Sequence, residues 1–207
     1  MTFLKAGVHA AVIDTALVIL DLEADNYFCL PNGGETLVRR PDGGAEVLRG
    51  PACDTLEAAG LLQAQAPPLV RTLPAKPSRT VIYDPAAVSW RDIHAGFGAA
   101  LEVRKIAPGS GITAYFSKPP GRPAGEPQVL RAARAFWRLQ PWLPIEGECL
   151  VRSALLVRAL HRQGLEADWV FGVRLFPFMA HCWVQAGDAC LNDDIERLSA
   201  YQPLLCR

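Results

Sequence analysis

The sequence has no surplus of charge of either sign, since 21 lysines and arginines balance 21 aspartates and glutamates. It therefore gives no reason to expect nonspecific binding to nucleic acid. It also lacks an apolar run of about 18 residues, the length that spans a bilayer. Its first seven residues lack the basic region and long apolar core of a signal peptide. We therefore expect a cytoplasmic protein that binds neither nucleic acid nor membrane.

Motifs for cofactors and metals are also scarce. The chain has no internal repeat, no Walker element, no G-x-G-x-x-G fingerprint and no C-x-x-C pair. Its six cysteines are expected to stay reduced in an unexported protein. A zinc site made of His181, Cys182, Cys190 and Cys206 is conceivable, but adjacent strand residues such as His181 and Cys182 point to opposite faces. We expect no cofactor and no metal.

The composition suits a globular protein, since half of the 207 residues are hydrophobic and a fifth are charged. The length allows one large domain or two small ones. Prolines concentrate between residues 66 and 78, and such density stiffens a connection. We therefore predict a front domain over residues 1–66, a linker over 67–80 and a second domain over 81–207.

The front segment reads as a small antiparallel sheet followed by short helices. Strands are predicted over residues 8–15, 16–22 and 27–30, with turn residues at 23–26. One or two helical turns are predicted within 33–40. A helix is predicted over 51–63, with Asp54 or Thr55 as its cap.

The second segment begins with helices. One is predicted over residues 88–103, capped near Ser89, and another over 128–140, with a long Gly- and Pro-rich loop over 108–127 between them. A third helix begins near Cys149 and carries an apolar stripe that includes Leu155, Leu156 and Leu160. Gly164 is its expected stop. The organisation is therefore α+β, with helices ahead of the strands described next.

Cys149 is a candidate nucleophile because of its place at the start of this helix. Unsatisfied N–H groups at a helix N-terminus carry partial positive charge, which favours a thiolate. The same groups can receive the oxyanion that forms when a carbonyl is attacked. The backbone N–H of Cys149 is the candidate for one oxyanion donor, and the sequence does not identify a second.

Two strands that follow supply a candidate base and acid. Residues 169–174 read as a central strand, and a second strand begins near Ala180, with His181 and Trp183 on one face. Residues 186–188 form the turn. A three-residue loop there pairs His181 with Asp193, whereas a two-residue loop pairs it with Asp194. Turn geometry alone leaves the acid open.

Cysteine, histidine and acid in this arrangement are the ingredients of a nucleophilic Cys-His-Asp site. Each residue also has an ordinary structural interpretation. A single buried cysteine is more often a small core residue, and Trp183 beside the histidine is more often packing than a channel wall. The joint pattern is less expected by accident than any one of its residues, and the residues alone leave both interpretations open.

A resemblance adds to this pattern. The run Cys149…Arg152-Ser153…Gly164-Leu165…Ala180-His181-Cys182-Trp183-Val184…Leu191-Asn192-Asp193 resembles the protease domain of lasso peptide B proteins, which is similar to transglutaminase-like and papain-like cysteine hydrolases. The resemblance implies that fold for residues 81–207, and it selects Asp193 as the acid. Cys182 departs from the family, which more often has alanine between the histidine and the tryptophan.

The front segment resembles the winged-helix-like recognition domain of the same family, best in the segment D-N-Y-F-C-L-P at residues 25–31. In that family the leader of a precursor peptide adds as a strand to the third strand. The resemblance implies a leader-binding edge at Asn26, Tyr27, Phe28, Cys29 and Leu30, with the helix over 51–63 as a wall. The alternative is that Tyr27 and Phe28 are core residues.

The function implied by the resemblance is that of a cysteine endopeptidase that removes the leader from a lasso peptide precursor. A separate cyclase of the asparagine-synthetase type would then close the ring on the new amine. The residues alone leave two alternatives: an amidase or acyltransferase that uses the same triad, and a non-catalytic scaffold that delivers the leader to the cyclase.

Overall fold

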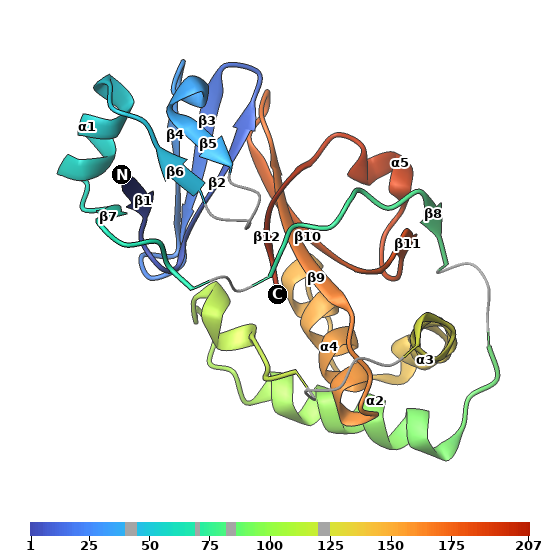
Figure 1. Ribbon diagram of the computed structural model, residues 1–207. Helices are drawn as coiled ribbons and strands as arrows, with labels where there is room; N and C mark the ends of the chain where they lie inside the picture. The colour runs from blue at the N-terminus through green and yellow to red at the C-terminus, as the bar shows by residue number, and fades with distance from the viewer. Residues whose placement is uncertain (40–44, 69–70, 82–85, 120–124) are drawn as a thin grey trace. The chain divides into compact units, whose positions relative to one another are not determined.

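The computed structural model describes residues 1–39, 45–68, 71–81, 86–119 and 125–207. The chain divides into two compact units (Figure 1). The first contains Met1–Leu73, Gly172–Ala180 and Gln202–Arg207, and the second contains Pro74–Phe171 and His181–Tyr201. The proposed division at residues 66 and 80 stays a prediction. Nothing in the sequence indicated that Gly172–Ala180 and Gln202–Arg207 would belong to the first unit.

The first unit holds two antiparallel sheets and a helix. One sheet has the order β2-β3-β4, and the other has the order β5-β6-β1-β7. The strands are β1 (Thr2–Leu4), β2 (Val8–Ile13), β3 (Ala16–Asp21), β4 (Asn26–Leu30), β5 (Leu37–Arg39), β6 (Ala45–Val47) and β7 (Leu62–Gln63). Helix α1 (Pro51–Ala58) turns Cys53 and Leu56 into a core shared with Leu17 and Ile19 of β3.

Two predictions for this unit are wrong in part. The helix predicted over 51–63 ends at Ala58, because Gly60 takes a positive φ of 69° and Leu62 pairs with Leu4 of β1. Its cap is Gly50, with Pro51 in the first turn, rather than Asp54 or Thr55. The helical turns predicted within 33–40 are one 3₁₀ turn, η1 (Gly34–Thr36), followed by β5. Residue 40 lies outside the described residues.

The second unit begins with three packed helices, α2 (Trp90–Arg104), α3 (Glu126–Leu139) and α4 (Cys149–Arg162). Ser89 caps α2 as predicted, in a reciprocal capping box with Asp92. Asp92 also accepts two hydrogen bonds from Arg131 of α3, at 2.7 and 2.9 Å, so the cap ties two helices together. Short 3₁₀ turns, η2 (Ile112–Tyr115) and η3 (Gln140–Trp142), lie between the helices.

A five-stranded sheet completes the fold, with the order β12-β9-β10-β11-β8. Its strands are β8 (Arg79–Thr80), β9 (Asp168–Arg174), β10 (Met179–Ala186), β11 (Ala189–Cys190) and β12 (Gln202–Cys206), with α5 (Ile195–Leu198) between the last two. The predicted α+β class is confirmed. No helix in the described part of the chain is both long and apolar enough to cross a membrane.

Candidate active site

Cys149 is the first residue of α4 and is partly exposed. Glu148 precedes it as the cap without a side-chain capping bond, and the first intrahelical bond of this turn runs from the Arg152 N–H to the Glu148 carbonyl at 3.0 Å. The helix ends at Arg162, and Gly164 beyond it has the positive φ of 75° that a C-terminal stop requires. The structure thus gives Cys149 the helix-start position predicted from the sequence.

His181 lies near the start of β10 and is buried, with 7% of its surface exposed. Its Nε2 hydrogen-bonds to Oδ2 of Asp193 at 2.5 Å. The imidazole and the Cys149 thiol lie close enough for each to shift the pKa of the other. Because Asp193 occupies Nε2, Nδ1 is the ring nitrogen that remains for the sulfur. The structure therefore brings together the three predicted side chains.

The electrostatics of these groups favour a charged pair. Burial pushes the pKa of His181 down, but hydrogen bonds and charge from Asp193 and Cys149 raise it to about 9. A hydrogen bond from Cys182 lowers the pKa of Cys149 against the effect of burial, and the hydrogen bond and charge of His181 lower it further, to about 4. At neutral pH the site holds a thiolate beside an imidazolium.

Asp193 is the acid that contacts His181. The hairpin nevertheless has the two-residue loop that, from the sequence, was expected to pair His181 with Asp194. Ala186 pairs with Ala189, so the turn is the two-residue loop Gly187-Asp188. Regular pairing ends at Cys190, however, and the chain then bends. Asp194 instead caps α5, where its side chain accepts the Glu196 N–H at 2.9 Å. The extrapolation of the ladder to residue 194 was wrong.

Asn192 holds this bend in place. Its Oδ1 accepts the backbone N–H of Val184 at 2.7 Å, which is the ladder position that β11 no longer fills. Its Nδ2 donates to Oγ of Ser153 on α4, also at 2.7 Å. From the sequence, Asn192 was noted only as part of the L-N-D run. Its amide is both a donor and an acceptor, so one short side chain can make both hydrogen bonds.

Where β11 no longer pairs with β10, side chains of α4 contact the edge of β10 instead. Residues 182 and 184 direct their N–H and C=O groups to the same edge. The Cys182 carbonyl accepts from Ser153 Oγ at 3.4 Å, and residue 182 lies close enough to Cys149 to lower the pKa of its thiol.

Aromatic residues complete the surroundings of the histidine. The His181 ring lies 5.2 Å from the ring of Tyr201, a neighbour that the sequence did not indicate. Trp183 is fully buried and donates to Gln185 at 2.8 Å, so its role is packing. Among the described residues no three side chains of the kinds that bind metals gather around a common point.

The predicted leader-binding residues form the edge strand β4. The order β2-β3-β4 leaves one side of this strand without a partner strand among the described residues. Asn26, Phe28 and Cys29 are exposed, and Tyr27 and Leu30 are partly exposed. The ring of Tyr27 packs on Phe178 at 5.5 Å. The core assignment considered for these residues is thus wrong for Phe28, whose side chain is 38% exposed.

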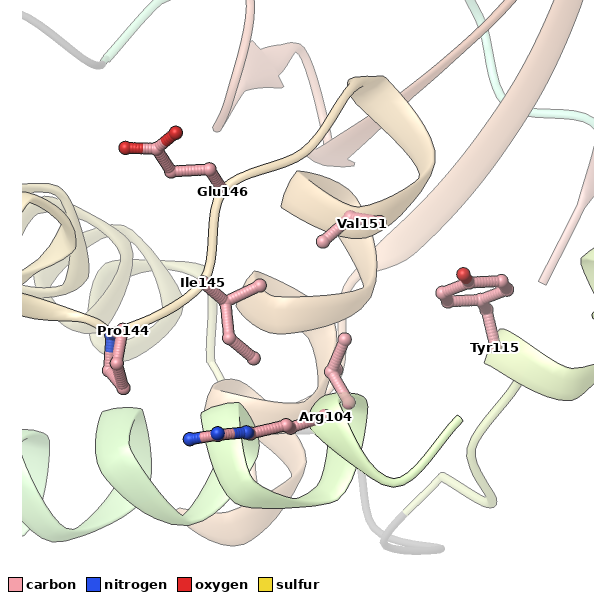
Figure 2. Close-up of a pocket in the computed structure, with 7 residues that line it drawn as sticks. Arg104, Tyr115, Pro144, Ile145, Glu146 and Val151 are labelled. Atoms are coloured by element: carbon pink, nitrogen blue, oxygen red, sulfur yellow. The ribbon is translucent and has the colours of Figure 1, made fainter. Parts of the chain in front are cut away.

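A cavity of about 400 Å³ lies along the segment that leads into α4. Figure 2 shows Ile145 and Val151 facing this space, with Arg104 and Tyr115 on other sides of it. Val103, Pro144 and Glu146 also line it. None of the three predicted catalytic residues does. The cavity neighbours the nucleophile along the chain but is not the catalytic constellation.

Two comparisons with known proteins found matches to the chain. A family model described as the transglutaminase-like superfamily matches residues 94–206. The microcin J25-processing protein McjB of Escherichia coli is 40% identical over 48 residues, which make up 23% of this chain and 23% of that protein. The match therefore spans about a quarter of the curated relative. No solved structure matches the chain. The predicted resemblance to lasso peptide B proteins is confirmed by these two matches.

Proposed function

Because the chain belongs to the transglutaminase-like superfamily, we propose that it is a cysteine endopeptidase that removes the leader from a lasso peptide precursor. The observation that carries the proposal is the hydrogen bond of His181 to Asp193, with the Cys149 thiol close enough to the same imidazole to shift its pKa. A histidine between a thiol and a carboxylate can hold a thiolate ready and later supply a proton. The relative's name describes the processing of microcin J25.

The first half of the reaction forms a thioester. The Cys149 thiolate attacks the carbonyl carbon of the scissile amide and gives a tetrahedral oxyanion, for which the Cys149 N–H at the helix start is the proposed donor. The His181 imidazolium then gives its proton to the departing amine nitrogen as the C–N bond breaks. The new N-terminus leaves, and the leader stays attached to the sulfur.

The second half releases the leader. Neutral His181 accepts a proton from water, whose oxygen attacks the thioester carbonyl, and the C–S bond breaks to return the thiolate. Asp193 keeps Nε2 protonated throughout, so that Nδ1 faces the sulfur and the water. The free amine on the remaining peptide is the group that a partner cyclase of the asparagine-synthetase type would join into the ring. Six cysteines that form no disulfide bond suit a reducing compartment such as the cytoplasm.

The leader is proposed to bind the first unit by strand addition to β4. An edge strand offers unpaired N–H and C=O groups to an extended peptide, and side chains such as Phe28 flank it. Holding the leader raises the effective concentration of the scissile bond at the sulfur. In this proposal the first unit binds the leader, and the second unit carries the residues that cleave the peptide.

Substitution of the nucleophile tests the proposal. Cys149→Ala should abolish trimming of a precursor peptide followed by mass spectrometry, while Cys190→Ala, which removes a buried thiol outside the triad, should retain it. Trimming by the Cys149→Ala variant would refute the nucleophile. If neither variant nor the native chain trims the peptide with the cyclase present, the scaffold alternative gains.

A binding experiment tests the edge separately. Phe28→Glu should weaken binding of a labelled leader peptide to the Cys149→Ala chain about 10-fold or more, through lost apolar contact and an added buried charge. Val12→Glu on β2 is the matched control, because Val12 is 37% exposed and Phe28 is 38% exposed. Equal weakening by both substitutions would remove β4 from the proposal.

A further inference from the structure

We propose that Ser153 is a positioning residue that sets how far the nucleophile lies from the base and the acid. It lies in the second turn of α4, four residues after Cys149, so the two side chains share one face of the helix. The inference rests on the proposed function for the reaction that this placement serves. It does not require Ser153 to touch the substrate.

The Ser153 hydroxyl is hydrogen-bonded to the two segments that carry the other members of the triad. Asn192 donates from Nδ2 to Ser153 Oγ at 2.7 Å, and Ser153 Oγ donates to the Cys182 carbonyl at 3.4 Å. The Cys182 thiol donates to the same oxygen at 3.7 Å, which completes its one donated and two accepted bonds. Asn192 directly precedes Asp193, and Cys182 directly follows His181. One hydroxyl therefore contacts the chain neighbours of both the acid and the base.

The bridge is also held at its far end. Asn192 Oδ1 accepts the backbone N–H of Val184 at 2.7 Å, so the amide is fixed on β10 as well as on α4. Ser153 is fully buried and Asn192 is buried, so bulk water does not compete for these bonds. A buried polar network whose members are all paired rigidifies its surroundings more than apolar contacts do. The network thus fixes the start of α4 against β10 and the bend that follows β11.

A serine is an unexpected residue at this place in the helix. The residues that follow it, Ala154, Leu155 and Leu156, are buried and apolar, and a buried hydroxyl costs free energy unless it is hydrogen-bonded. A serine inside a helix often donates back to the carbonyl four residues earlier, which here belongs to Cys149. Ser153 donates instead to β10. Its hydroxyl is therefore used between elements rather than within the helix.

Loss of this hydroxyl would change the geometry of the reacting groups. It would leave Nδ2 of Asn192 without its partner on α4, so the helix could move against β10. A displacement of about 1 Å can lower a rate about 100-fold. The charges that act on the thiolate are those of His181 and, through it, Asp193, so a wider separation would also weaken the attraction between thiolate and imidazolium. Leader binding by the first unit does not involve this hydroxyl.

Alkylation of Cys149 by iodoacetamide tests the placement without any substrate. The rate is followed from pH 3 to pH 9 by mass spectrometry of tryptic peptides, since trypsin cleaves after Arg152 and separates Cys149 from residue 153. The native midpoint should lie near the pKa of Cys149, about 4. In Ser153→Ala it should rise by about one pH unit. With a precursor peptide, kcat should fall about 10–100-fold while KM changes by less than about 3-fold.

Two further variants make the test specific. Ser153→Cys is close to serine in size, but its thiol is a weak donor and acceptor. Its midpoint should shift in the same direction as that of Ser153→Ala, and it carries the test if the alanine variant does not fold. Ser89→Ala is the matched control, because it makes the same change in the same unit and removes the cap of α2. It should unfold at a lower urea concentration with the native midpoint and the native kcat.

Three results would decide the matter. An alkylation profile of Ser153→Ala or Ser153→Cys that superimposes on the native one would overturn the inference. So would an equal midpoint shift in Ser89→Ala, because the effect would then follow from a general loss of stability. If the Ser153 variants shift the midpoint but the native chain cleaves no precursor peptide, the proposed function is refuted and the positioning role of Ser153 is kept.

Discussion

The charge of Asp193 is predicted to set the alkaline limit of activity. The thiolate and imidazolium coexist between the pKa of Cys149, about 4, and that of His181, about 9. Cleavage needs both, since the thiolate attacks and the imidazolium protonates the leaving amine. The pH profile of kcat/KM should therefore be a broad bell whose acid limb belongs to Cys149 and whose alkaline limb belongs to His181.

Asp193→Asn removes the charge but not the hydrogen bond. The amide oxygen can still accept the Nε2 proton, so the imidazole keeps its orientation. Asp193 is the first of the groups that raise the pKa of His181 against burial, and the Cys149 thiolate supplies the rest. We expect the alkaline limb to move down by about 1–2 pH units, which corresponds to about 1–3 kcal/mol at 1.36 kcal/mol per unit. Activity at pH 6 should fall much less than activity at pH 8.

Two further variants sharpen this test. Asp193→Ala loses both orientation and charge, so it should lower kcat/KM at every pH, whereas Asp194→Asn, which changes the cap of α5, should leave the alkaline limb in place. Initial rates of precursor cleavage across pH 4–10 give the profiles. An alkaline limb that stays near pH 9 in Asp193→Asn would refute the assignment of Asp193 as the group that keeps His181 charged.

Two other predictions concern the supports of the site. Asp92→Asn should cost about 1–2 kcal/mol at pH 7 in urea unfolding, a modest figure because Arg131 is half exposed to water. The pKa of Asp92 is lowered to about 2 from 3.8, so its contribution is present above pH 4 and lost as the pH falls through 2; a variant whose deficit persists at pH 2 would contradict this. Gly147→Ala should lower kcat/KM about 10–100-fold, since its Cβ would lie 2.6 Å from Cβ of Val151 and would shift the segment before the nucleophile. Gly125→Ala, whose Cβ meets nothing closer than 3.8 Å, should be neutral, and equal losses in both glycine variants would show that the effect is not local.

The elements that could be predicted from the sequence are those whose own residues determine them. The helix from Cys149 has an apolar stripe, cations in its last turn and Gly164 as a stop. It begins at Cys149 as predicted and ends at Arg162, two residues before Gly164. Ser89 caps α2 because its partner Asp92 is only three residues away. The strands around His181 likewise follow their β-branched and aromatic residues.

Predictions failed where a distant partner decides the structure. Residues 62–63 continue the apolar pattern of α1, but Leu62 is taken by β1 as a sheet partner, and local propensity carries no trace of that pairing. The hydrogen bond between Asn192 and Ser153 of α4 was missed for a similar reason. Alternation assigns a side chain to a face of a strand, but it does not describe the helix that meets that strand.

The choice between Asp193 and Asp194 depends both on the local hairpin register and on a side-chain contact that ends the strand. The hairpin register alone points to Asp194, and the register is right for as long as the ladder lasts. The ladder is short because Asn192 offers its side chain to the Val184 N–H in place of a backbone carbonyl. That exchange bends the chain within one residue, so the acid that follows Asn192 reaches His181 and the next one begins α5. The acid is therefore selected by the residue that ends the strand, and the same amide, through Ser153, fixes the distance between β10 and the helix that carries the nucleophile.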